Sequence, residues 1–188
     1  PAVSAINFYT EFSNPLKPHY SWNRSLPDSE LMFTSGDLAV YFGFASELGT
    51  LKEKNPNLNF DVTQFPQAQG DTRITFGKMK ALAITKSSKN PGAAFTVISG
   101  LSTVNAMNQF SAMLRLPPVR RDLISKGTTD QYLSVFYRSA LWARGFPDPS
   151  RFATRDIFRQ MVEAVTGGRL DSAEAVDQAD QNLSALLR

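Results

Sequence analysis

The sequence predicts an α/β chain that is rich in helix and has few strands. Short apolar or alternating runs, bounded by Gly, Pro and Asn, lie in the first half and are typical of strands. In the second half, apolar residues recur at helical spacing over longer segments. The 188 residues suffice for one domain, or for two small lobes, with a hydrophobic core.

Three helices are expected in the first half. The first covers residues 2–12 and ends before Pro15. A short second helix begins near Pro27, because Pro is favoured at early helical positions, and it is broken by residues 35–37. The third begins at Ala45 or Ser46 and continues to Lys54.

Three extended segments lie between and after these helices. Residues 38–44 form a short apolar run, which predicts a buried strand. Residues 58–63 alternate apolar with polar side chains, which predicts a half-buried strand. Residues 72–85 are expected to be extended, with a break at Gly77 and Lys78.

The second half is predicted to be helical. Pro and Gly residues separate the helices, and Asp171 with Glu174 has the spacing of a capping box. The expected helices cover residues 91–101, 103–114, a short basic segment within 119–126, 131–144, 152–165 and 172–187.

Composition excludes several classes of chemistry. The chain has no Cys, so thiol catalysis, disulfides and zinc ribbons are excluded, and its single His19 cannot form a His-rich metal site. Nucleotide-binding, metalloprotease and esterase motifs are absent. The longest apolar run, residues 38–45, is too short to span a bilayer. We therefore expect neither an enzyme nor a metal or other cofactor.

Charge does not favour a nucleic-acid partner. The net charge is only +3, which is a weak field. A basic cluster, Arg115, Arg120, Arg121 and Lys126, lacks the interleaved aromatic residues on which bases stack. We interpret this cluster as a solvated helix end.

Aromatic residues near the ends of elements suggest a binding site. Trp22 lies in a loop, Phe44 lies between a predicted strand and a helix, and Phe146 lies in the Pro-rich bend of residues 146–149. Ligands of open α/β sheets bind at such positions, and flat rings suit the apolar face of a sugar. The alternative is that these rings fill the core.

The order of several segments resembles family 1 extracellular solute-binding proteins, the carbohydrate-type receptors of ABC importers. Phe33-Thr34-Ser35-Gly36-Asp37-Leu38-Ala39-Val40 is similar to that family's F-x-x-G-x-A-A-M stretch, although Leu38 and Val40 replace the usual Ala and Met. Residues 60–66 are similar to its strand that ends in Pro. Residues 77–94 are similar to G-x-x-x-x-I-x-x-x-S-K-N-P-x-x-A. Residues 116–120 and the closing helix, 168–187, are also similar to segments of that family.

The resemblance implies the C-terminal half of a two-lobed, periplasmic-binding-protein-like fold. Residues 1–71 and 128–188 would belong to the C-terminal lobe. Residues 72–85 would form a strand that crosses the hinge, and the helices of residues 86–127 would pack on the N-terminal lobe. We expect these helices to need the N-terminal lobe, or a swapped copy of the chain, to cover their apolar faces.

The resemblance also implies a function and its residues. A sugar or another small polar solute would bind between the lobes and be delivered to an ABC permease, in a periplasmic or extracellular protein that could carry a lipid anchor. Phe44 or Trp22 would stack on the solute, Ser46 and Asp148 would bond its hydroxyls, and the backbone at Gly77 would approach it closely. The cleft loops also include Lys78 and Phe146, while Asp148 has the alternative role of a helix cap.

Two other functions remain open from the sequence. A helical interaction or regulatory module would use the apolar face of residues 173–187 and would have no small-molecule site. An enzyme would need two carboxylates that converge in a pocket, whereas Asp156 and Glu163 have the spacing of a solvated helix face.

Overall fold

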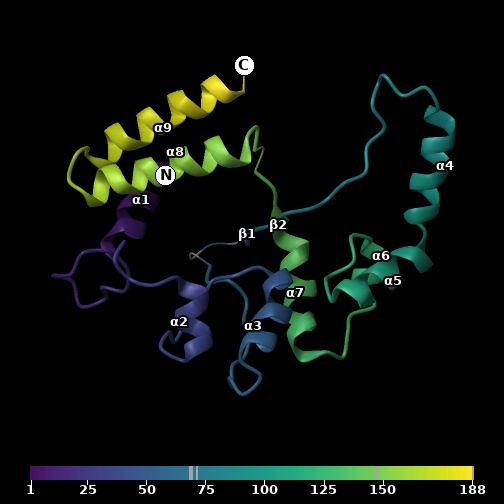
Figure 1. Ribbon diagram of the computed structural model, residues 1–188, viewed down its shortest axis with the longest axis horizontal. Helices are drawn as coiled ribbons and strands as arrows, with labels where there is room; N and C mark the ends of the chain where they lie inside the picture. Colours follow the sequence, from purple (N-terminus) through teal and green to yellow (C-terminus); the bar gives the residue numbers. More distant parts are fainter. Residues whose placement is uncertain (68–69, 71, 147, 188) are drawn as a thin grey trace. The chain divides into compact units, whose positions relative to one another are not determined.

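The computed structural model describes residues 1–67, 70, 72–146 and 148–187 (Figure 1). The chain divides into two units. Unit 1 comprises residues 1–27 and 147–188, and unit 2 comprises residues 28–146. The described part is rich in helix and contains two short parallel strands, as the sequence predicts for a helix-rich chain with few strands.

Unit 1 is built from three helices. These are α1 (Ala2–Glu11), α8 (Arg151–Thr166) and α9 (Ser172–Leu186). Helices α8 and α9 pack along each other, and α1 packs against both (Figure 1). The turn between α8 and α9 uses Gly168, whose φ of 66° favours glycine.

Small side chains form the contact between these helices. Ala175 is 1% exposed and Ala179 is 5% exposed, one helical turn apart on α9, and Ala164 of α8 and Ile6 of α1 are also buried. The predicted capping box is confirmed, because Asp171 accepts hydrogen bonds from the backbone of Ala173 and Glu174, and Glu174 accepts one from Asp171 N. The residues around Asp171 therefore specify where α9 starts, while the position of α9 against its neighbouring helices depends on two alanines.

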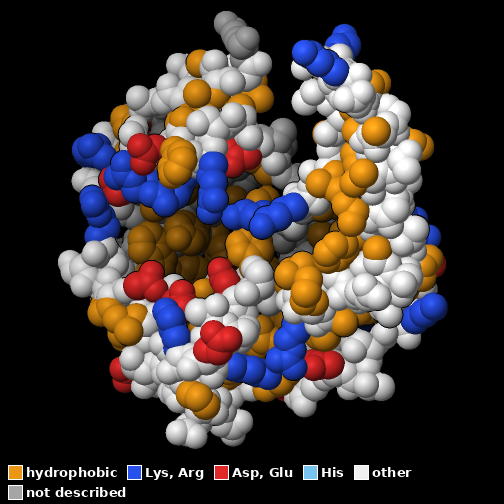
Figure 2. Space-filling model, turned by 45° about the vertical axis from the view of Figure 1, so that its right-hand side comes forward, with side chains coloured by type: hydrophobic (Ala, Val, Ile, Leu, Met, Phe, Trp, Pro, Cys, Tyr) orange, Lys and Arg blue, Asp and Glu red, His pale blue; other side chains and the backbone are white. Residues whose placement is uncertain are grey.

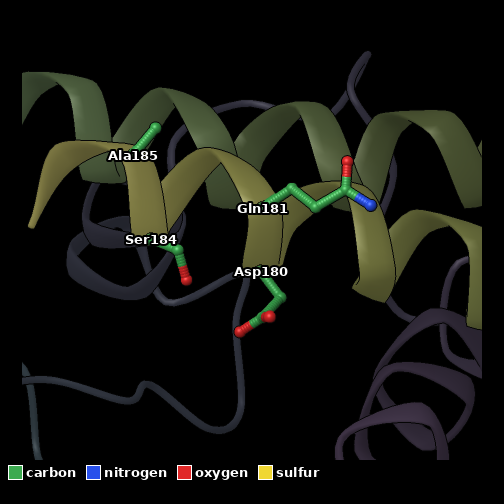
Figure 3. A pocket seen from close by; sticks show the side chains of 4 residues that line it. All are labelled: Asp180, Gln181, Ser184 and Ala185. Carbon is green, nitrogen blue, oxygen red and sulfur yellow. The ribbon is translucent and has the colours of Figure 1, made fainter. Parts of the chain in front are cut away.

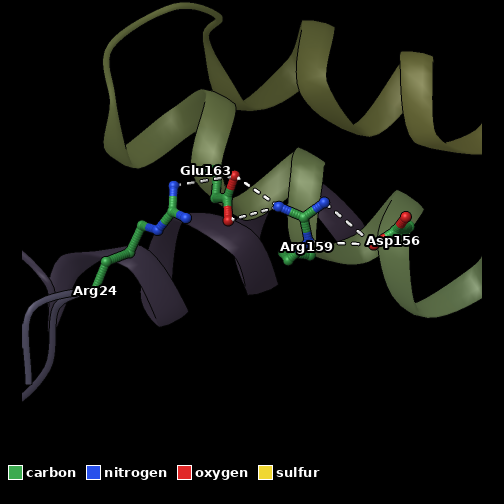
Figure 4. Close-up of polar contacts among 4 residues, drawn as sticks. All are labelled: Arg24, Asp156, Arg159 and Glu163. Atoms are coloured by element: carbon green, nitrogen blue, oxygen red, sulfur yellow. Dashed lines mark hydrogen bonds and ion pairs between the residues drawn. The ribbon is translucent and has the colours of Figure 1, made fainter. Parts of the chain in front are cut away.

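A polar network ties the loop after α1 to α8 (Figure 4). Arg159 bonds to Asp156 and Glu163 on its own helix, and Arg24 lies 3.4 Å from Glu163. Asp156 and Glu163 are thus both engaged by arginine. Asp156 is exposed, as expected of a solvated helix face, whereas the Glu163 side chain is only 18% exposed.

Unit 2 contains short helices and the two strands. Helix α2 (Ser29–Ser35) begins at Asp28, whose side chain accepts a hydrogen bond from Glu30 N. The chain continues through the 3-10 helix η1 (Ala45–Glu47), α3 (Leu48–Lys54), β1 (Thr75–Phe76), α4 (Pro91–Leu101), α5 (Val104–Leu114), α6 (Arg121–Ile124), α7 (Gln131–Trp142) and β2 (Ala143–Arg144).

Two predicted strands are wrong. Residues 38–44 and 58–63 contain no strand in the structure, and within 72–85 only Thr75 and Phe76 are paired. A strand needs a hydrogen-bonded neighbour, and an apolar or alternating pattern does not supply one. The predicted helices are confirmed, with bounds shifted by a few residues, and the last turn of the helix expected to end at Arg144 is instead β2.

The helices α4 and α5 expose apolar side chains. Helix α4 has no buried residue, and Phe95 is 65% exposed. On α5, Met113 is 71% exposed and Leu114 is also exposed. Hydrophobic side chains gather on the surface in Figure 2. Whether α4 and α5 pack on another lobe stays a prediction, as do the lobe boundaries.

We predict that Ala175→Leu destabilises unit 1, because the larger side chain does not fit between closely packed helices. The expected loss is about 1–3 kcal/mol in the free energy of unfolding, measured by urea denaturation followed by circular dichroism. Ala185→Leu is the matched control, since Ala185 lies on the exposed side of α9. Equal effects of the two substitutions would contradict the packing described.

Candidate functional site

The candidate site lies where β1 and β2 pair in unit 2. The strands are parallel, with Thr75 opposite Ala143 and Phe76 opposite Arg144. Gly77 N then donates a hydrogen bond to the carbonyl oxygen of Arg144 at 3.0 Å. Because helix α7 leads directly into β2, this pairing joins the end of α7 to a segment about seventy positions earlier in the sequence.

Gly77 allows the two strands to approach closely. A Cβ atom at this position would lie 2.7 Å from the Cβ of Ala143, which is closer than side chains tolerate. The sequence predicts that the backbone at Gly77 approaches a ligand. The structure shows a close approach to Ala143, so the absence of a side chain has a structural reason here.

Two rings and an ammonium group gather beside this pairing. The ring centroids of Phe44 and Phe76 are 6.0 Å apart. The Lys78 Nζ lies 4.6 Å from the Phe44 centroid and 5.9 Å from that of Phe76, within the range of a cation–π contact. We call Phe44, Phe76 and Lys78 the ring–lysine cluster. Phe76 is 53% exposed, so the cluster is open to solvent.

Glu47 holds the backbone of Phe44 in place. Its Oε2 atom accepts hydrogen bonds from Phe44 N at 2.8 Å and from the Tyr41 hydroxyl at 3.1 Å. Burial, followed by the negative charge and hydrogen bond of Glu47, raises the pKa of Tyr41 to about 12. Glu47 therefore anchors both ends of the turn that precedes η1.

A row of aromatic rings supports the same turn from within unit 2. Phe33 lies 5.4 Å from Tyr41 and 5.4 Å from Phe60, and Phe60 lies 5.9 Å from Tyr132. The Tyr132 hydroxyl donates to the carbonyl oxygen of Phe60, and Lys52 Nζ lies 3.7 Å from the centre of the Tyr132 ring. These contacts connect α2, the segment near Phe60 and α7, which leads into β2.

The structure brings together three of the predicted site residues, Phe44, Gly77 and Lys78. Ser46 is exposed on η1 in the same unit, and Phe146 is exposed two residues after β2.

The other two predicted residues, Trp22 and Asp148, belong to unit 1. The Trp22 ring lies 5.0 Å from that of Tyr9, and Asp148 is exposed. Asp148 does not cap α8, because Ser150 is the N-cap residue. Pro147, in the predicted bend, lies outside the described residues.

Sequence reasoning missed Phe76, Arg144 and Glu47. Phe76 directly precedes Gly77, which was a predicted site residue, so Phe76 could have been included from its position alone. Glu47 follows Phe44 by the three residues typical of a reach-back to the backbone. Arg144 carries no such signal, because only the strand register places it beside Phe76.

A shallow pocket on unit 1 is a weaker candidate. Asp180, Gln181, Ser184 and Ala185 line it, and all four come from α9 (Figure 3). A ligand site needs polar groups that converge from several elements, and one face of a single helix does not provide them.

The basic cluster near α6 is partly neutralised. The Arg120 guanidinium makes two 3.0 Å hydrogen bonds to the Asp122 carboxylate and a third to the carbonyl oxygen of Ser102. The hydrogen bonds from Arg120 hold the pKa of the Asp122 carboxyl below its usual range. The described residues contain no group of three His, Asp or Glu side chains arranged to hold a metal ion.

Comparison with known proteins adds no assignment: no family model matches the chain, and a search of curated proteins finds no significant match.

Among the described residues, no helix combines the length and the apolar character needed to cross a bilayer.

We predict that Gly77→Ala weakens the pairing of β1 with β2, because the added methyl group meets the Ala143 side chain. Overpacking of this kind costs about 1–3 kcal/mol in the free energy of unfolding, measurable by urea denaturation. Gly100→Ala is the control, since a Cβ there meets no atom within 4 Å and Ala favours a helix by up to about 1 kcal/mol. A stabilising Gly77→Ala would show that the strands are not closely paired.

We predict that Tyr41 ionises at a higher pH than tyrosine ordinarily does. Between pH 10 and about 12 its phenol ionises in the unfolded chain and stays protonated in the folded chain, so rising pH favours unfolding over this interval. An absorbance titration of tyrosinate should lose one transition near pH 12 in Tyr41→Phe. Loss of a transition near pH 10 would instead show that burial and Glu47 do not raise the pKa of Tyr41.

Proposed function

We propose that this chain is the C-terminal half of a two-lobed receptor that binds a sugar-like solute and delivers it to an ABC permease. The observation that carries the proposal is the ring–lysine cluster. It combines an exposed ring, Phe76, and a half-buried ring, Phe44, with a flexible cation beside the two paired strands. Flat rings offer an apolar surface for the C–H face of a pyranose, and the polar groups around them supply hydrogen bonds.

The apolar faces of α4 and α5 support the same proposal. The resemblance assigns residues 86–127 to packing on the N-terminal lobe, and this segment contains exposed side chains such as Phe95, Met113 and Leu114. Exposed apolar patches of this kind mark surfaces that bind another chain or domain. The missing partner is the N-terminal lobe or a second copy of the chain.

In this proposal, binding has no chemical step. The solute lies between the lobes, stacked on Phe44 or Phe76, and closure about the segment of residues 72–85 buries it. The permease recognises the closed form, which the solute stabilises by binding it better than the open form. The receptor acts in the periplasm or outside the cell, where a lipid anchor would keep it near the membrane.

A helical interaction module is the second candidate. The exposed faces of α4 and α5 favour it, because they fit a protein partner as well as they fit a missing lobe. It differs from the receptor in requiring no small molecule at the ring–lysine cluster.

We predict that sugars bind the chain weakly and at this cluster. Titration with a panel of neutral and acidic trisaccharides should shift the aromatic NMR signals of Phe44 and Phe76. Phe76→Ala should weaken binding about tenfold, which corresponds to about 1.4 kcal/mol. Phe95→Ala, which removes an exposed ring on α4, is the control. If no trisaccharide shifts these signals at millimolar concentration, the receptor proposal is wrong and the interaction module is favoured.

A further inference from the structure

Two cations lie on one face of the strand pair at the candidate site. Phe76 and Arg144 are register partners, so their side chains leave the same face of the two strands. Lys78 follows Phe76 by two residues, and its ammonium group lies over the Phe44 and Phe76 rings. The strand pairing therefore gathers two rings and two positive charges from three segments of unit 2.

Neither cation has a carboxylate partner among the described residues. The ion pairs there involve other basic residues, and the Arg144 guanidinium bonds only to the carbonyl oxygen of Ala143. Glu47 borders the cluster, but its carboxylate is engaged by Phe44 N and the Tyr41 hydroxyl. Glu47 keeps its negative charge beside the cluster, but two cations lie there and neither forms an ion pair with a described carboxylate.

Lys78 also controls access to the rings. At 4.6 Å from the centroid of Phe44, its ammonium group occupies the ring face on which a sugar would stack. A cation–π contact at an exposed position is weak, whereas an ammonium–carboxylate contact is charge-assisted. An anionic ligand can therefore draw Lys78 off the ring and uncover the stacking surface. A neutral sugar must displace the ammonium group without forming a charge-assisted contact that replaces the lost cation–π contact.

We propose that the solute is a sugar that carries an anionic group, either a carboxylate or a phosphate. This inference rests on the proposed receptor function and specifies its ligand. The pyranose stacks on Phe44 and Phe76. The anion accepts hydrogen bonds from Lys78 and from Arg144, whose planar guanidinium can bond two oxygens of one anion. Selectivity over neutral sugars comes from the release of Lys78 from the ring.

The test compares two ligands with the same sugar rings, one with ionised carboxylates and one with uncharged methyl esters in their place. Trigalacturonate and its methyl ester share the same sugar rings, and their binding to the 188-residue chain is measured by NMR titration. We expect trigalacturonate to bind at least tenfold more tightly than the ester. This preference should fall as sodium chloride is raised from about 20 to 300 mM, because salt screens exposed charges.

Variants locate the charge that produces the preference. Lys78→Gln should reduce the ratio of acid to ester binding more than Arg144→Gln does, and it should leave ester binding unchanged or tighter, because the ring is no longer covered. Arg144→Gln should lower the ratio in part. Lys89→Gln removes the same charge from an exposed position outside the cluster and should leave the ratio unchanged.

The outcomes separate the inference from the proposed function. Equal binding of acid and ester, or a Lys89→Gln effect as large as that of Lys78→Gln, would overturn the inference and leave the receptor proposal standing. Failure of both ligands to bind would overturn the receptor proposal itself. Glucose 6-phosphate and inorganic phosphate complete the set. Tighter binding of the sugar phosphate supports a stacked anionic sugar, whereas equal binding of the two would show an anion site without stacking and overturn the inference.

Discussion

The candidate site depends on the contact between β1 and β2. A short parallel ladder holds residues 75–77 against residues 143–144, and it closes only because Gly77 has no side chain to meet Ala143. This contact sets Phe76 beside Arg144 and turns Lys78 toward the ring of Phe44. Parallel pairing requires a long crossover, and here α4, α5, α6 and α7 lie between the two strands. The site is therefore assembled from distant segments by very few hydrogen bonds.

The two units obtain their cohesion in different ways. In unit 1, alanines allow α8 and α9 to pack closely, and α1 covers them. In unit 2, a row of rings from Tyr41 to Tyr132 adds to a small core that includes buried Leu51 and Leu123, and much apolar surface on α4 and α5 is exposed. Apolar burial is the main stabilising contribution to folding, so an uncovered face of this kind is unfavourable unless another surface packs on it. The uncovered faces of α4 and α5 are therefore the surfaces of unit 2 on which another chain or domain would pack most favourably.

The sequence predicted the helices well and the strands poorly. Helix signals are local: Asp28 and Asp171 cap the following helices, and Pro91 begins α4. The runs at 38–44 and 58–63 have the right residue types for strands, yet their ladder partners would have to come from elsewhere in space. The sequence singled out Phe44, Gly77 and Lys78, which the structure brings together. It did not single out Arg144, because only the strand register places Arg144 beside Phe76.

The sequence by itself determined which segments are helical to within a few residues, which side chains are aromatic or charged, and which cysteine- and histidine-based chemistries are excluded. These properties depend on residues within one or two turns of each other, or on composition alone. Only the tertiary structure decided that Lys78 covers an aromatic ring, that Glu47 is engaged by Tyr41 and Phe44, and that Arg144 lies beside Phe76. The reason is that the pairing of strands far apart in the chain depends on how the intervening helices pack, and no local pattern encodes that packing.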